Sequence, residues 1–360
     1  MQRSLLLLEN CINSEETRKQ YLYYLSRFIS HYSLKDCDSI LAVEQKKLVV
    51  MIEDYVIYLK KQISPNTLPT YLFALKSFLE INDVNLNWKR IKRLYPAKVK
   101  LSGRKAWSTD DIKKMLEFAP DIRAKSIIHF LSSTAARIGS LPDIKLKNVE
   151  EMPDNCKSVL IYEGSTEEYY CFLIPESVRI LNLYLEKRKK DGEILTPDSP
   201  LFRKSYMFGG TKGVPLTKEG IESIIRRIVH NAGLRNDKIG KRYGVQQNHG
   251  FRKRAATLLK LNKNVNANSI EKILGHKNGI DGIYFTPSKS ELFEQFRNGI
   301  VDLTLDDSER VRIENEKLQR EKQELERKNS EIEILKRAQN EQIENQKMIL
   351  DVLKQRGIIP

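Results

Sequence analysis

Apolar residues recur at helical spacing in four runs along the first hundred residues. Positions three and four apart share one face of a helix, so each run predicts an amphipathic helix. Asn13 with Glu16 three residues later indicates the start of the first helix, and Pro65 the start of the third. We therefore expect a small helical bundle over residues 13–95, with the apolar stripes as its core. The four stripes are Tyr21, Leu22, Leu25, Phe28 and Ile29; Leu48, Ile52, Tyr55, Val56 and Leu59; Tyr71, Leu72, Leu75, Phe78 and Leu79; and Trp88 and Ile91.

A second domain is predicted to begin at Ser108, a good helix N-cap residue with Asp111 at the third helical position. One β-hairpin interrupts its helical pattern. Residues 158–162 and 169–174 are rich in β-branched and aromatic side chains, with Gly164, Ser165 and Thr166 between them. The fold class expected is mainly α with a small β-hairpin or sheet. The other helical stretches are residues 175–190, 217–232, 251–262, 268–275 and 288–304.

Residues 305–360 form a charged tail that is almost free of Gly and Pro up to residue 356. One heptad column of this tail is largely apolar, whereas the neighbouring column is polar in its first half. The pattern is a weak coiled-coil signal, and a single solvated helix is nearly as good an interpretation. The first column holds Val311, Leu318, Leu325, Ile332, Gln339, Gln346 and Leu353; the second holds Asn315, Lys322, Asn329, Lys336, Ile343 and Leu350.

Positive charge is concentrated before the tail. The whole chain has a net charge of +15, and residues 305–360 contribute 12 basic and 13 acidic side chains. Residues 1–304 therefore hold 50 basic and 34 acidic side chains, a net charge of +16. A region this basic suits a polyanion, either nucleic acid or an acidic membrane surface, and a merely solvated basic surface is the alternative.

The densest positive charge lies in residues 89–105, which contain no acid. Pro96, Ser102 and Gly103 interrupt any long helix there, so we interpret the segment as an interdomain linker. Its charge density favours a linker that follows phosphates over one that is only solvated. The domains expected are 1–95, a linker at 96–107, 108–304 and the tail 305–360. The residues expected to contact phosphates are Lys89, Arg90, Lys92, Arg93, Lys98, Lys100, Arg104 and Lys105.

Other patterns argue against several kinds of site and location. The four cysteines show neither CxxC spacing nor a nearby histidine cluster, which argues against a zinc site or a disulfide framework. No apolar run approaches the length of a membrane-spanning helix, and residues 5–8 are too short for a signal-peptide core, so we expect a cytoplasmic protein. There is no Walker-type loop, HExxH motif or carboxylate set spaced like a two-metal nuclease. The cysteines are Cys11, Cys37, Cys156 and Cys171.

Four short clusters carry the side chains that could do chemistry. Arg137 lies at a break after an apolar helix, and His249 and Arg252 lie in a His-Gly-Phe-Arg motif at the start of another. His276 closes a Leu-Gly-His motif, and Tyr284 follows eight residues later. Each alone has an ordinary structural interpretation: a surface ion pair, a satisfied histidine or a core tyrosine.

Together the five residues describe a site for phosphoryl transfer. Two guanidinium groups can hold the non-bridging oxygens of a phosphodiester and stabilise the charge of its transition state. Histidine can move a proton near neutral pH, and tyrosine can attack phosphorus to form a covalent intermediate. The set contains no metal ligand cluster, so it favours chemistry without a metal.

The order Arg…His-x-x-Arg…Leu-Gly-His…Tyr resembles the tyrosine recombinases, also called the phage integrase family, over residues 13–303. The phrases around Gly275–Tyr284 look most similar to archaeal integrases. The resemblance implies that a helical core-binding domain and a catalytic domain clamp double-stranded DNA. It implies that Arg137 and Arg252 hold the phosphate, His249 handles the tyrosine proton, His276 hydrogen-bonds the phosphate, and Tyr284 is the nucleophile that forms a 3′-phosphotyrosine.

The resemblance also implies partners and cofactors. It implies that the chain forms homo-oligomers on DNA, with a tetramer in the synaptic complex, and that it needs no metal or nucleotide cofactor. We expect no membrane partner, and a nucleoid-associated location in the cytoplasm of a prokaryotic or archaeal host. The helix at 288–304 looks like the one that this family passes between protomers.

Two positions depart from the family pattern. Ser140 stands three residues after Arg137, where the family usually has Glu. The hairpin contains no lysine at its turn, where the family usually carries a catalytic one; Lys157 is early in the strand and Lys212 is in a later loop. The general acid is therefore unassigned. A topoisomerase-like enzyme that nicks and reseals one duplex and a DNA-binding relative with impaired catalysis stay open as alternatives.

Overall fold

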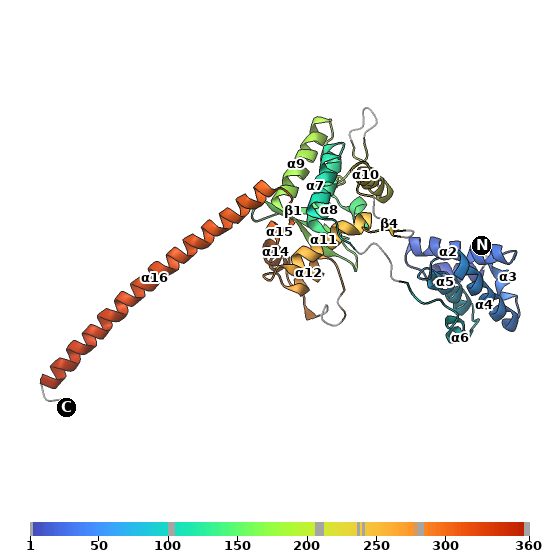
Figure 1. Ribbon diagram of the computed structural model, residues 1–360, viewed down its shortest axis with the longest axis horizontal. Helices are drawn as coiled ribbons and strands as arrows, with labels where there is room; N and C mark the ends of the chain where they lie inside the picture. Colours follow the sequence, from blue (N-terminus) through green and yellow to red (C-terminus); the bar gives the residue numbers. More distant parts are fainter. Residues whose placement is uncertain are drawn as a thin grey trace. The chain divides into compact units, whose positions relative to one another are not determined.

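The computed structural model describes residues 3–99, 105–205, 212–235, 238–239, 242–277, 279 and 284–355. The chain divides into two compact units, Met1–Leu101 and Ser102–Pro360 (Figure 1). Each unit has a hydrophobic core of its own. The mainly helical fold class with a small sheet is confirmed. Lys100, Ser102, Gly103 and Arg104, which the sequence analysis named, lie outside the described residues.

The first unit is a helical bundle whose core contains the four predicted apolar stripes almost entirely. Helices α2 and α5 pack against each other, and α1, which the sequence pattern did not predict, packs on α5 with Leu8 buried. The short helix α3 was not predicted either. The helices are α1 (Arg3–Asn10), α2 (Glu15–His31), α3 (Cys37–Leu41), α4 (Gln45–Gln62), α5 (Leu68–Ile81) and α6 (Trp88–Lys92).

Two predicted helix starts in this unit are wrong by a few residues. Ser14, not Asn13, caps α2, because its side chain accepts a hydrogen bond from the Thr17 N–H. Pro69 lies in the first turn of α5, whereas Pro65 lies in the turn before it. Proline is common in both places, because neither position needs the backbone N–H that proline lacks. The sequence pattern alone therefore could not show which proline begins the helix.

The second unit surrounds helix α8, whose side chains are buried over most of its length. Helices α9 and α11 pack on α8, and so does strand β3. Ser108 caps α7 through a complete capping box with Asp111, as predicted. The helices before the sheet are α7 (Thr109–Glu117), α8 (Ile122–Thr134), and the short 3₁₀ helices η1 (Ile138–Asp143) and η2 (Leu146–Asn148).

The predicted hairpin, β2 and β3, is part of an antiparallel sheet of three strands in the order β1-β2-β3. Ile161 pairs with Tyr169 at the turn end of the hairpin, and Lys157 pairs with Leu173 at the other end. Strand β1 was missed, because it carries two exposed glutamates and shows no apolar alternation. The strands are β1 (Val149–Met152), β2 (Cys156–Ile161) and β3 (Tyr169–Leu173), and a separate pair is formed by β4 (Lys238–Ile239) and β5 (Arg242–Tyr243).

The remaining helices follow the predicted stretches closely, with one division. The predicted helix at 288–304 is interrupted at Gly299, where an added Cβ would overlap Leu259. None of the helices in the described residues is long and apolar enough to cross a membrane. The helices are α9 (Pro175–Lys190), α10 (Lys218–Asn231), α11 (Gln247–Leu261), α12 (Ala267–Ile273), α14 (Lys289–Arg297), α15 (Ile300–Leu303) and α16 (Asp307–Gln355).

Candidate active site

Arg137 follows the sharp end of helix α8. The helix closes on Ala135, which is buried and has a φ of 53°, a left-handed conformation that is costly for a residue with a Cβ. The Thr134 hydroxyl stabilises the turn by accepting a hydrogen bond of 3.2 Å from the Ala136 N–H. The Ala135 carbonyl then accepts a hydrogen bond of 2.8 Å from Nη1 of Arg252. The turn therefore joins the segment of Arg137 to that of Arg252.

Ser140, which departs from the family pattern, holds the backbone of Arg137. Its hydroxyl donates to the Arg137 carbonyl over 2.7 Å, and its N–H donates to the same oxygen over 2.9 Å. Ser140 itself is buried. The Ser140 hydroxyl therefore fixes the backbone at the start of η1. It positions Arg137 and adds no charge to the site.

His276 is placed by a Schellman motif at the end of α12. Gly275 has a φ of 63°, its N–H donates to the Lys272 carbonyl, and the His276 N–H donates to the Glu271 carbonyl. A Cβ at Gly275 would overlap the ring of Tyr169, so glycine is required for two reasons. The reversal brings Nδ1 of His276 to 2.5 Å from Oε2 of Glu271.

Arg252 links these parts from helix α11. Its Nη2 donates to the Leu274 carbonyl over 2.5 Å and lies 2.7 Å from Nε2 of His276. Arg137 reaches the same turn, because its Nη2 donates to the Gly275 carbonyl over 3.0 Å. Burial lowers the pKa of Arg252, and the positive charge of Arg137 lowers it further, whereas Tyr169 opposes the shift. Two guanidiniums held close together form a site for an anion.

His249 lies in the first turn of α11, three residues before Arg252 and on the same side of the helix. The helix starts at Gln247, earlier than the predicted 251, so His249 is helical rather than a residue before the helix. Partial burial lowers the pKa of His249, and the positive charges of Lys253 and Arg252 lower it further. The imidazole is therefore neutral at pH 7, which is the form that accepts a proton.

Tyr284 is 83% exposed and takes part in none of the hydrogen bonds that connect Arg137, Arg252 and His276 within the described residues. Of the predicted site residues, the structure thus joins Arg137, Arg252 and His276, places His249 on the same helix as Arg252, and leaves Tyr284 in solvent.

The hairpin turn presents one carboxylate, that of Glu167, to the site. Glu167 lies 3.9 Å from Nη1 of Arg137, and Glu163 is held by Lys147 and Asn148. Lys157 pairs with Glu151 at the far end of β2, four residues from the Ile161 end and so about 13 Å along the strand. Lys157 is therefore excluded as a residue of this site by its place in the sheet.

An open pocket of about 440 Å³ lies beside the two catalytic candidates Arg137 and His276. Nη1 of Arg137 is buried and has no hydrogen-bond partner among the described residues, which leaves a donor for a ligand oxygen. Lys277 also lines the pocket and is exposed. The described residues contain no group of three or more side chains that could hold a metal ion.

Sequence reasoning missed Glu271, which accepts from both His276 and Lys260. Burial alone would raise the pKa of Glu271, but the hydrogen bonds from Lys260 and His276 bring it below the usual value. A signal was available: Gly275 directly after a helical stretch predicts a Schellman motif, which would bring the residue five positions before His276 close to it.

The predicted phosphate-contacting residues fall into both units. Lys89, Arg90 and Lys92 are exposed on α6, and Arg93 follows that helix. The absence of acids from residues 89–105 predicted that the positive charge of Arg90 has no acidic partner. Arg90 instead forms an ion pair of 2.8 Å with Glu53. Lys98 is exposed, while the Lys105 N–H donates to the Gly244 carbonyl, so Lys105 is part of the second unit.

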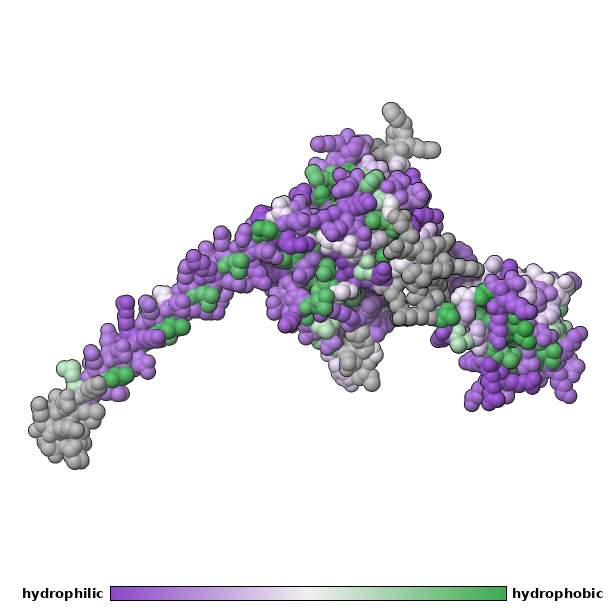
Figure 2. All heavy atoms as spheres, in the orientation of Figure 1, coloured by the Kyte–Doolittle hydropathy of each residue, from purple (hydrophilic) through white to green (hydrophobic). Residues whose placement is uncertain are grey.

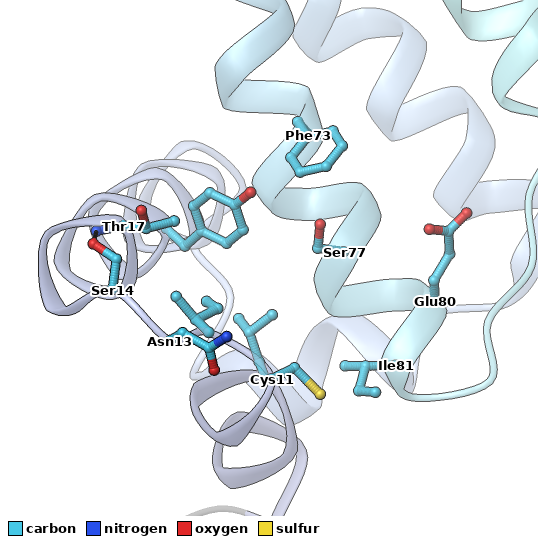
Figure 3. Close-up of a pocket in the computed structure, with 11 residues that line it drawn as sticks. Cys11, Asn13, Ser14, Thr17, Phe73, Ser77, Glu80 and Ile81 are labelled. Carbon is cyan, nitrogen blue, oxygen red and sulfur yellow. Dashed lines mark hydrogen bonds between the residues drawn. The ribbon is translucent and has the colours of Figure 1, made fainter. Parts of the chain in front are cut away.

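A second pocket, of about 500 Å³, lies between α1, α2 and α5 in the first unit. Figure 3 shows Phe73, Ser77 and Ile81 of α5 facing Thr17 and Cys11 across this pocket. Its lining is apolar and hydroxylic, with Glu80 at the edge and no basic side chain. It therefore offers no positive charge to a phosphate.

Comparison with known proteins identifies the family. The model of the phage integrase family matches residues 105–287, which is half of the chain. The chain belongs to the phage integrase family. The tyrosine recombinase XerA of the archaeon Pyrococcus horikoshii is 25% identical over 270 residues, covering 74% of this chain and 80% of that protein. The expected likeness to archaeal integrases is confirmed.

Solved structures of this family support the fold. The Tn1549 transposon integrase in complex with transposon right end DNA matches with a TM-score of 0.52 and 15% identity, covering 82% of this chain and 98% of that chain. A lambda integrase dimer bound to a COC′ core site matches with a TM-score of 0.51 and 16% identity, covering 80% of this chain and 96% of that chain. XerH recombinase bound to its difH substrate matches with a TM-score of 0.50 and 20% identity, covering 78% and 77%.

Proposed function

We propose that this chain is a site-specific DNA recombinase that cuts and rejoins DNA through a covalent bond between Tyr284 and a 3′-phosphate. The observation that carries the proposal is the hydrogen-bonded group of Arg137, Arg252 and His276, which come from three separate segments, with Arg137 and His276 lining the pocket. Membership of the phage integrase family supports the same reaction class.

The two arginines bind the non-bridging oxygens of the scissile phosphate in this mechanism. Nη1 of Arg137, which has no hydrogen-bond partner among the described residues, donates to one oxygen. Arg252 exchanges its contact with His276 for a contact with the phosphate, while the Ala135 carbonyl continues to hold its Nη1. Their positive charges stabilise the additional negative charge of the transition state. His276, supported by Glu271, donates to the phosphate from Nε2 when protonated.

The covalent step exchanges one phosphodiester bond for another. The Tyr284 oxygen attacks phosphorus as its proton passes to neutral His249, and the bond from phosphorus to the 5′-oxygen breaks. The 5′-oxygen leaves as a hydroxyl, with a proton from solvent or from a cation of the pocket. A 5′-hydroxyl from the same or another duplex reverses the step. Tyr284, which is exposed, must move to the pocket for this attack.

Double-stranded DNA and further copies of the chain are the partners in this proposal. The XerH, lambda integrase and Tn1549 integrase structures are complexes with DNA, and the lambda integrase is a dimer. Exchange between two sites requires four copies, one for each strand that is cut. The net charge of +16 over residues 1–304 supports DNA binding. The protein would act on DNA in the cytoplasm, associated with the nucleoid. Every step above uses side chains, so no metal or cofactor is assigned to it.

Covalent capture from a DNA library tests the reaction without knowledge of the target site. The purified chain is incubated with fragmented DNA of its host and with a random-sequence duplex library. The complexes are denatured, and DNA attached to protein is recovered and sequenced. We expect recovered 3′-ends to converge on one short sequence, and Tyr284→Phe to recover none while still binding DNA. Tyr243→Phe is the matched control, because Tyr243 lies in the same unit but contacts Arg235.

Two results would contradict the proposal. A covalent adduct that persists in Tyr284→Phe would exclude Tyr284 as the nucleophile. The absence of any adduct, together with sequence-specific DNA binding, would instead favour the alternative of a relative with impaired catalysis. A topoisomerase-like enzyme would relax supercoiled plasmid as a monomer without joining two sites, so an assay for the joining of two captured target sites distinguishes that alternative.

A further inference from the structure

Helix α16 contacts the rest of the second unit near its start, and the side chains that follow are exposed. Near its start, Asp307 pairs with Lys113 over 2.5 Å and Glu309 pairs with Arg179 over 3.3 Å. Ile313 packs against the core of the unit, and Arg320 reaches Asp154 over 3.4 Å. From residue 314 to residue 346 every side chain of the helix is exposed. The helix is therefore held at its base, while most of its length has no tertiary contact in one chain.

The exposed part carries an aliphatic column at seven-residue spacing. Val311, Leu318, Leu325 and Ile332 are 54%, 61%, 61% and 48% exposed. Figure 2 shows hydrophobic residues as separate patches along one side of α16, surrounded by hydrophilic ones. A column this regular is typical of position d of a coiled coil. A helix of 49 residues is also far longer than the average of about 11–12 residues.

A helix stabilised only by its own ion pairs does not account for this column. Four i,i+4 pairs, between Arg312 and Glu316, Lys317 and Glu321, Lys322 and Glu326, and Glu324 and Lys328, support the segment from 312 to 328. Further along the helix, Ile332, Leu335, Ile343 and Ile349 are exposed, and so are Ile334 and Met348 on the opposite side. The ion pairs explain helicity in the first half but not the aliphatic residues, which need a partner.

We propose that residues 311–343 form a parallel, in-register, two-stranded coiled coil with a second copy of this chain. The two asparagines of the column beside the aliphatic one, at position a, select this arrangement. The column reads Asn315, Lys322, Asn329 and Lys336. In a parallel pair in register each Asn faces its own counterpart, so one amide donates to the other. In an antiparallel pair each of these polar residues would face an aliphatic residue, which leaves a buried amide unpaired.

Charge is compatible with the same arrangement. In the parallel pair, Lys328 at position g lies opposite Glu333 at position e of the other strand. Glu321 at position g lies across the interface from Glu326 at position e, and Lys322 between them offsets their repulsion. Three or four strands would bury the Lys322 and Lys336 ammonium groups more deeply than two, so a two-stranded assembly is the one that keeps them solvated.

The oligomeric state of the full-length chain without DNA tests the interface. Sedimentation equilibrium should give about twice the chain mass of 41.9 kDa. The double variant Leu325→Asp, Ile332→Asp should raise the dissociation constant of the dimer by at least about 100-fold, because it puts carboxylates into the interface. The matched control is Gln323→Asp, Ser330→Asp, which adds the same charge to the outer face and should remain dimeric. Circular dichroism checks that all variants are folded.

Disulfide crosslinking tests the direction and register. Cys11 is the exposed one of the four cysteines, so the background is Cys11→Ser. Leu318→Cys should then form a disulfide-linked dimer under mild oxidation, because the two copies of residue 318 face each other. Arg327→Cys, on the outer face, should link far less. A monomeric full-length chain, a dimer unchanged by Leu325→Asp, Ile332→Asp, a trimer or tetramer, or a dimer that Leu318→Cys cannot link would each overturn the proposal.

Discussion

Arg252 lies 2.7 Å from His276, with its Nη2 directed at Nε2 of the imidazole. A guanidinium can only donate, so Nε2 is the acceptor, and the ring proton is on Nδ1, which faces Glu271. In this state His276 has no proton to offer a phosphate from Nε2. The hydrogen bond between Arg252 and His276 therefore fixes which ring nitrogen of His276 carries the proton.

Arg137→Lys and Arg252→Lys should each reduce the cleavage rate by about two orders of magnitude, equivalent to about 3 kcal/mol of transition-state stabilisation. Lysine keeps the positive charge but loses the planar fork that holds two oxygens. Single-turnover cleavage of the captured target DNA measures the effect, with DNA binding as the control. Cleavage near the wild-type rate in either variant would exclude that arginine from the site.

Glu271→Gln should slow cleavage by about 10- to 100-fold, because the neutral amide no longer stabilises a charged His276. Lys260→Met is the matched control: it removes the other partner of Glu271 and leaves the carboxylate facing His276. A positioning role predicts a change in the pH dependence of cleavage for Glu271→Gln with unchanged thermal stability. An equal loss of activity in both variants, accompanied by a lower melting temperature, would indicate a structural role only.

The pH dependence of cleavage should report His249. Its pKa lies below the usual 6.5, chiefly through burial and then through Lys253 and Arg252. The neutral form accepts the tyrosine proton, so cleavage should persist below pH 6.5 and fall as the pH drops through the lowered pKa. Lys253→Gln removes one positive charge, raises the pKa of His249, and should shift the acid limb to higher pH. An acid limb that does not move would exclude His249 as the base.

EDTA should leave cleavage unchanged, since each proposed role belongs to a side chain. The assay uses the captured target DNA, with EDTA present throughout purification and reaction. Addition of magnesium, manganese or zinc afterwards provides the comparison. Activity that disappears with EDTA and returns with one of these ions would overturn the metal-independent mechanism.

The exposed lysines of α6 should bind DNA phosphates without regard to sequence. Replacing Lys89 and Lys92 with Gln should flatten the plot of log affinity against log salt by about 0.9 for each phosphate that the variant no longer neutralises. Arg90→Gln should change the slope less, because Arg90 already pairs with Glu53. Affinity for target and unrelated duplexes should fall by the same factor. An unchanged salt slope in the double variant would mean that this surface is only solvated.

Sequence reasoning identified most helices, because an amphipathic stripe depends only on local spacing. It failed where an element is stabilised by contacts from elsewhere. Helix α1 has an apolar run with no clear period, and its burial of Leu8 against α5 depends on the packed bundle. Strand β1 is polar, and its pairing of Val149 with Val159 is provided by β2. Neither the burial of Leu8 nor the pairing of Val149 can be predicted from the sequence of its own segment.

The sequence by itself predicted the reaction class and the residues proposed to perform it, because Arg137, His249, Arg252, His276 and Tyr284 occur in an ordered set of motifs. Only the tertiary structure decided which of them meet. The left-handed turn at Ala135 and the Schellman motif at Gly275 bring carbonyls from distant segments to the same guanidiniums. Such contacts depend on backbone direction after a turn, which side-chain spacing does not encode. The same reason explains why Glu271 was found only in the folded chain, and why Lys157 was excluded only by its place in the sheet.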